Sequence, residues 1–126
     1  MWSSIFSIAI GAIIGALLRW QLGRIDTLFI AKISVGTLTA NLLGGYLIGV
    51  AAAIFIKVPQ ASQEWRLLIM TGFLGSFTTF SSFSLEMITM LQQGRILWAF
   101  TGITLHMLGT LMMTVLGFST IEFLEN

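Results

Sequence analysis

Hydroxyl side chains and phenylalanines alternate within residues 76–84, which is chemically the most unusual stretch of the chain. Six residues there carry hydroxyls, and three phenyl rings recur at every third position: Phe77, Phe80 and Phe83. A hydroxyl can donate a hydrogen bond to an anion, and the edge of a phenyl ring carries partial positive charge. A stripe of rings ordinarily serves packing, but rings interleaved with donors also form a dry wall that attracts an anion.

The same stretch is a poor continuous helix. Glycines at positions 72 and 75 weaken the helix. The hydroxyls can form hydrogen bonds with backbone groups that have lost their helical partners. Unwound backbone at membrane depth lines a cavity or lies buried in protein, and broken helices form ion sites. Freed carbonyls suit a small hard cation, whereas freed N–H groups suit an anion. We therefore expect this helix to be broken.

A face of small residues recurs every four positions in an earlier apolar segment: Thr37, Asn41, Gly45, Gly49 and Ala53. Asn41 is the informative member, because an amide in hydrocarbon must find partners. It brings two N–H donors that an anion could use, or it makes an interhelical hydrogen bond that only holds the bundle together.

Further polar positions lie in the later apolar segments. Glu86 follows the hydroxyl stretch within an apolar frame, where an ionisable side chain is a functional candidate by default. His106, Thr110 and Thr114 share one helix face, although such hydroxyls commonly bond back to their own helix. These groups are mostly donors, and all of them could converge in one slot.

Gly11, Gly15 and Arg19 are spaced four residues apart near the start of the chain. The two glycines indicate close packing of helix backbones. Arg19 either snorkels to the membrane interface beside Trp20 or supplies a positive charge to a functional site.

The elements that must position these residues are membrane helices. Of the 126 residues only 9% are charged and 56% are hydrophobic, whereas about a quarter are charged in a soluble domain. A membrane crossing takes about 20 residues, so the chain allows four. The charge-free runs predict one all-α integral membrane domain, residues 1–126, with four transmembrane helices at approximately 3–22, 34–56, 67–91 and 97–121.

Composition excludes several functions. The chain has no cysteine, so disulfides and thiol catalysis are ruled out. A net charge of +1 without a basic run argues against nucleic acid as a partner. No nucleotide-binding motif is present, and no nucleophile, base and acid lie at useful spacing, so we do not expect an enzyme.

The basic residues hardly select an orientation in the bilayer. Lys57 and Arg66 fall on the side of the termini, and Arg24, Lys32 and Arg95 fall on the other, with a further arginine at its margin. Orientation follows the bias of such residues, and here the bias is weak. A chain that inserts both ways can pair with an inverted copy of itself, so an antiparallel homodimer is our hypothesis.

The motifs together resemble those of the Fluc, or CrcB, family of fluoride channels over essentially the whole chain. The matching segments are Gly11-x3-Gly15-x3-Arg19-Trp20, Gly36-Thr37-Leu38-x2-Asn41-x2-Gly44-Gly45-Tyr46-x2-Gly49, and Thr71-Gly72-x2-Gly75-x2-Thr78-Thr79-Phe80-Ser81-x-Phe83-Ser84-x-Glu86. The resemblance implies a passive, fluoride-selective channel in the cell inner membrane that exports cytoplasmic fluoride and lowers its toxicity. It also implies an antiparallel dual-topology homodimer with two pores.

The resemblance assigns roles to individual residues. Backbone carbonyls of Gly75 and Thr78 match those that hold a structural sodium ion at the dimer centre, and Phe80, Phe83 and Asn41 match pore residues. Arg19 matches an arginine near the centre of the assembly. Residues on or near the polar track of the pore are Thr37, Ser81, Ser82, Glu86, Thr110 and Thr114. Thr110 stands where members often carry serine, and His106 lies where members vary and receives no role.

Two other functions remain as alternatives. A small multidrug-type exporter is also a short antiparallel dimer, but its proton coupling calls for a carboxylate deep in the first helix, and the first acid here is Asp26 in a loop. A purely structural subunit would explain the small-residue faces but not hydroxyls interleaved with rings. Fluoride selectivity fits better, because many neutral donors in a narrow space replace the ion's water without trapping it.

Overall fold

The computed structural model describes residues 1–27 and 33–125, and this part of the chain is helical without any strand. Four helical segments are long and apolar enough to cross a membrane: Trp2–Asp26, Val35–Lys57, Gln63–Gln92 and Ile96–Glu125. The predicted all-α class with four membrane helices is therefore confirmed.

The four segments divide into shorter elements. The first contains α1 (Trp2–Gly23) and all but the last residue of the 3-10 helix η1 (Arg24–Thr27), and the second is α2 (Val35–Lys57). The third consists of α3 (Gln63–Arg66), the π-helix η2 (Leu67–Leu74), α4 (Gly75–Phe77) and α5 (Phe80–Gln92), and the last is α6 (Ile96–Glu125). We call α3 to α5 together the third segment.

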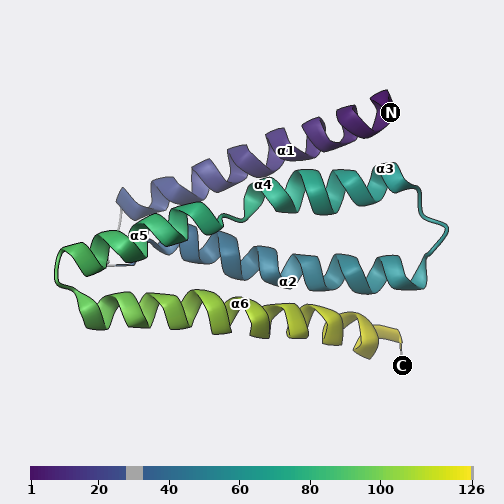
Figure 1. Ribbon diagram of the computed structural model, residues 1–126. Helices are drawn as coiled ribbons and strands as arrows, with labels where there is room; N and C mark the ends of the chain where they lie inside the picture. Colours follow the sequence, from purple (N-terminus) through teal and green to yellow (C-terminus); the bar gives the residue numbers. More distant parts are fainter. Residues whose placement is uncertain (28–32, 126) are drawn as a thin grey trace.

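The segments run up and down beside one another (Figure 1). Both termini lie at one end, together with the connection from α2 to α3, and the turn from α5 to α6 lies at the other. α1 packs along η2 and α4, whereas α2 packs along α6. Lys32, which entered the charge count, lies outside the described residues.

Close backbone contact joins α1 to the third segment. Gly11 and Gly15 are both buried. A Cβ added to Gly11 would lie 2.6 Å from the backbone nitrogen of Phe73, and one added to Gly15 would lie 3.0 Å from that of Phe77. The predicted packing role of these two glycines is confirmed, because a methyl group at either position would meet backbone.

The third segment leaves helical geometry at two residues. Thr78 has a ψ of 160°, and Thr79 has a φ of −151° and a ψ of 112°, so both are extended between α4 and α5. The Thr79 hydroxyl then caps α5 by accepting a hydrogen bond from the Ser82 amide. Gly72, which we expected to weaken this helix, instead packs against Ile8 and Gly11 of α1.

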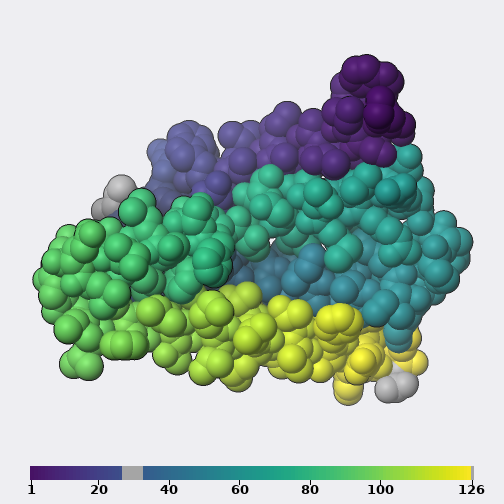
Figure 2. Space-filling view, viewed as in Figure 1, coloured from purple at the N-terminus to yellow at the C-terminus, as the bar shows by residue number. Residues whose placement is uncertain are grey.

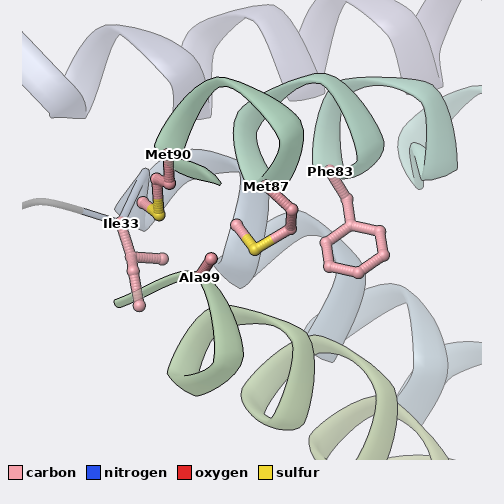
Figure 3. Packing of buried hydrophobic residues seen from close by; sticks show 5 residues of the cluster. All are labelled: Ile33, Phe83, Met87, Met90 and Ala99. Carbon is pink, nitrogen blue, oxygen red and sulfur yellow. The ribbon is translucent and has the colours of Figure 1, made fainter. Parts of the chain in front are cut away.

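A buried apolar cluster fixes α5 to α6. Its members are Ile33, Phe83, Met87, Met90 and Ala99. Figure 3 shows the phenylalanine and both methionines extending from α5 toward α6, where Ala99 lies. Flexible thioethers fill the irregular space between the helices. The inner face of α5 is thereby held over α6.

We expect Gly49→Ala to lower the stability of the fold by about 1–3 kcal/mol through overpacking. Gly49 lies on α2 against α6, and an added Cβ would stand 3.1 Å from the backbone nitrogen of Phe118 and closer still to the carbonyl oxygen of Thr114. Thermal unfolding of the detergent-solubilised protein measures the loss. Gly23→Ala is the matched control, since a Cβ there meets nothing within 4 Å. Equal melting of the two variants would contradict close packing of α2 on α6.

Candidate functional site

A cavity of about 450 Å³ lies among α2, the third segment and α6. In Figure 2 it is the hollow between the third segment and α6, with α2 behind it. Its lining brings together most of the residues singled out in the sequence: Asn41, Gly75, Thr78, Phe80, Phe83, Thr110 and Thr114. Thr79 and His106 join them. The cavity is therefore the candidate site.

The Asn41 side chain forms hydrogen bonds with both backbone groups of the extended residue Thr79. The Thr79 amide donates to Asn41 Oδ1 at 2.8 Å, and Asn41 Nδ2 donates to the Thr79 carbonyl at 3.0 Å. Backbone groups that leave the helical ladder need other partners when they are buried, and one amide side chain supplies both here. Of the two roles considered for Asn41, the structure contains the interhelical hydrogen bond.

Two carbonyls near the extended pair lose their usual helical donors. The amide four residues after Gly75 is that of Thr79, which donates to Asn41 instead. The amide four residues after Thr78 is that of Ser82, which donates to the Thr79 hydroxyl at 3.2 Å. Gly75 is also exposed in the single chain. These carbonyls fit the oxygen ligands that a small hard cation such as sodium requires.

Arg19 reaches the same region from α1. Its Nε donates to the carbonyl of Ser76, on α4, at 3.1 Å. The side chain therefore bonds to the end of α4, where helix carbonyls carry partial negative charge. The structure thus shows Arg19 bonded to the third segment, and its role at a functional site stays a prediction.

The three phenylalanines of the hydroxyl stretch separate into two environments. Phe77 is buried and stacks on Phe73, with ring centroids 5.6 Å apart. Phe80 and Phe83 form an edge-to-face pair 5.4 Å apart at the cavity. Phe80 is 71% exposed and Phe83 only 7% exposed, so one ring faces outward and the other lies inside. Only this second pair can present ring edges to the cavity.

On α6 the polar track combines packing and hydrogen bonding. Thr114 donates to the Gly45 carbonyl of α2 at 2.9 Å and also lies 3.1 Å from the Thr110 carbonyl one turn earlier. The methyl group of Thr110 packs against Gly45, where an added Cβ would stand 2.8 Å away. The Thr114 hydroxyl thus joins α2 to α6.

Five predicted site residues lie outside the cavity lining: Arg19, Thr37, Ser81, Ser82 and Glu86. The backbone amide of Ser82 donates to the Thr79 hydroxyl that caps α5, and Ser81 is exposed, with its hydroxyl 3.4 Å from that of Thr79. Thr37 belongs to the start of α2, and the half-buried Glu86 faces it. The polar residues therefore form two groups instead of one slot.

Asp26 organises the second group, which the sequence did not reveal. Its Oδ2 accepts from the Ser34 hydroxyl at 2.5 Å, and its Oδ1 accepts from the Gly36 amide at 3.0 Å. The Ser34 hydroxyl in turn caps α2 by accepting from the Thr37 amide at 3.2 Å. A carboxylate beside the first turn of a helix is stabilised by the helix dipole. No spacing rule links an acid to a cap eight residues later.

Fold and site together define a multi-pass membrane protein with a largely apolar cavity that carries a few polar groups beside an extended pair of residues. The model of the CrcB family, described as CrcB-like protein, Camphor Resistance, matches residues 6–118, and the chain belongs to this family.

Curated relatives cover nearly the whole chain. A protein of Pseudomonas aeruginosa (strain UCBPP-PA14) is 51% identical over 124 residues, which is 98% of this chain and 98% of that protein. A protein of Tolumonas auensis is 53% identical over 126 residues, covering 99% of this chain and 98% of its own length. Both are named fluoride-specific ion channel FluC. Ion channels are not enzymes, in agreement with the sequence expectation.

We expect Asn41→Leu to destabilise the extended pair, because both backbone groups of Thr79 then lose their partner. Each buried unsatisfied group costs about 1–3 kcal/mol. Hydrogen exchange measures the effect at the Thr79 amide, which should exchange much faster than in the parent chain. Ser84→Ala is the control, since it removes an exposed hydroxyl from the same stretch. Equal protection of the Thr79 amide from exchange in the leucine variant and the parent chain would contradict a stabilising role for the two Asn41 hydrogen bonds.

Proposed function

We propose that the chain is a passive, fluoride-selective ion channel that lets cytoplasmic fluoride leave the cell and so lowers its toxicity. The observation that carries the proposal is the meeting of ring edges, hydroxyls and an amide in one cavity of a CrcB-family chain. The name of its relatives, fluoride-specific ion channel, agrees with this chemistry.

The chemistry of the cavity suits a small, strongly hydrated anion. Such an ion sheds water only where donors replace it, and neutral donors do so without the full charge that would hold it in place. The edges of Phe80 and Phe83 and the positive end of the α5 dipole supply partial charge instead. The anion can then bind selectively and still leave the cavity.

The direction of transport follows from the membrane potential. Fluoride enters cells as neutral HF from acid surroundings and ionises inside. An interior-negative potential drives an anion outward by about 2.3 kcal/mol per 100 mV. A passive pore in the cell inner membrane is sufficient, which agrees with the lack of a nucleotide-binding motif in the sequence.

We further propose that two chains assemble as an antiparallel, dual-topology homodimer with two pores. Phe80 and Gly75 are exposed at the extended pair, where a partner would cover them. The freed carbonyls of Gly75 and Thr78 would hold a structural, non-transported sodium ion at the centre, and Arg19 lies beside them. In this proposal the extended pair is the functional break of the third helix.

The function is tested by ion efflux from liposomes that contain the purified protein. We expect rapid fluoride efflux and little chloride efflux from the parent chain. Equal leakage of both ions, or of neither, would contradict the proposal. Phe83→Ile should slow fluoride at least about tenfold, the effect of losing roughly 1.4 kcal/mol of favourable interaction. Met112→Leu is the packing control on the exposed face of α6, and it should leave the rate unchanged.

The dimer should depend on sodium. We expect thermal dissociation at lower temperature when sodium is exchanged for N-methylglucamine, because a large organic cation cannot fit carbonyl ligands spaced for sodium. Size-exclusion chromatography after heating measures this. A single cysteine replacing the exposed Gln60, in the connection from α2 to α3, tests orientation, since the chain has no other cysteine. An impermeant thiol reagent should label about half of the chains in sealed vesicles if both orientations occur equally; labelling of all or none would contradict dual topology.

Proton-coupled drug export is not favoured. α1 carries no acidic side chain. Asp26, the first acid of the chain, is engaged by Ser34 and the Gly36 amide at the start of α2. A carboxylate committed to a helix cap is poorly placed to exchange protons with a cationic drug.

A further inference from the structure

The chain's single histidine, His106, lies at the centre of the candidate site without an assigned role. It is 3% exposed, lines the cavity from α6, and lies with its ring centroid 4.5 Å from that of Phe83. Its Nδ1 is 3.1 Å from Asn41 Nδ2. Its Nε2 is buried and has no hydrogen-bond partner among the described residues. A buried polar atom without a partner calls for an explanation.

The backbone of Thr79 determines which way the Asn41 amide faces. An N–H group can only donate and a carbonyl can only accept, so the Thr79 amide must face Oδ1 and the Thr79 carbonyl must face Nδ2. Rotating the amide by 180° would break both bonds. The second hydrogen of Nδ2 therefore points to His106 Nδ1.

This orientation selects one form of the imidazole. Nδ1 faces an N–H donor, so it must be an unprotonated acceptor. The hydrogen of the neutral ring is then on Nε2. His106 thus carries a buried N–H donor whose position is set through Asn41 by the extended backbone.

We propose that His106 Nε2–H is a fixed hydrogen-bond donor for the permeating anion beside Phe83. The proposal rests on the fluoride-channel function above and deepens it by naming a residue that meets the ion. Asn41 then acts as a positioning residue that holds the histidine in its donor form.

Most other donors of the cavity, the Thr110 hydroxyl apart, are committed to acceptors among the described residues. Both Asn41 hydrogens have acceptors, and the Thr79 amide donates to Asn41. The Thr78 hydroxyl donates to the Leu74 carbonyl at 3.0 Å, and the Thr114 hydroxyl donates to a carbonyl of α2. An ion that has lost water needs donors that are not already bonded to another acceptor. His106 Nε2–H is such a donor, and it carries no full charge that would trap the anion.

The competing explanation is that His106 only accepts the hydrogen bond from Asn41. Two substitutions separate the roles. In His106→Asn, the side-chain oxygen can replace Nδ1 as the acceptor for Asn41, but nothing replaces the Nε2 donor. In His106→Gln, the longer side chain can place an N–H near the Nε2 position, but the acceptor at Nδ1 is lost.

We expect His106→Asn to slow fluoride efflux about tenfold, as loss of a hydrogen bond to an ion predicts, and His106→Gln to slow it less. The reverse order, or parent rates in both variants, would overturn the proposal. Thermal unfolding of each variant controls for folding. Absence of fluoride efflux from the parent chain would instead refute the proposed function itself.

Nuclear magnetic resonance gives a second readout that does not depend on the variants. Protein labelled with ¹⁵N-histidine and carrying a histidine-free tag reports one residue. We expect a protonated Nε2 and an unprotonated Nδ1, with the Nε2 resonance shifting on addition of sodium fluoride but not of sodium chloride. A protonated Nδ1, or an Nε2 resonance indifferent to fluoride in a chain that conducts it, would overturn the proposal even if both variants lost activity by misfolding.

Discussion

The paired hydrogen bonds between Asn41 and the backbone of Thr79 are the interaction on which the site depends. Two consecutive extended residues inside an apolar bundle expose backbone groups that water cannot satisfy, and each would be costly if left unpaired. One amide on α2 satisfies both groups of Thr79. It thereby ties α2 to the junction of α4 and α5 and allows the third segment to leave helical geometry within the protein.

Several features of the site follow from this constraint. Because the Thr79 amide bonds to a side chain, the carbonyl of Gly75 loses its helical donor. Because Asn41 is held in one orientation, its remaining hydrogen fixes the imidazole of His106. The carbonyls proposed to bind a cation and the donor proposed to face an anion can therefore both arise from one local departure from the helix. Opposite ends of two short dipoles meet there, with carbonyls ending α4 and amides beginning α5.

Sequence reasoning predicted four membrane helices and singled out several of the polar residues that line the cavity, since both depend on local patterns. Charge-free runs of sufficient length give membrane helices whatever their neighbours are, and small residues at four-residue spacing place a close-packing face, as at Gly49. It did not separate Thr37 and Glu86 from the cavity. Helical spacing shows which residues share a face of a helix, but it does not show at what height along the bundle that face contacts a neighbouring helix.

The sequence by itself determined that this chain spans a membrane and which polar residues lie within its spans, because both depend on composition and period. Its motifs also placed it in the CrcB family, which the full-length similarity to curated relatives confirmed. Only the tertiary structure decided what those polar groups bond to. Asn41, Thr79 and His106 lie 27 or more positions apart in sequence, and the direction of each hydrogen bond depends on the backbone that faces it. Which groups donate and which accept therefore depends on how the helices pack, and it cannot be read from any single segment of the sequence.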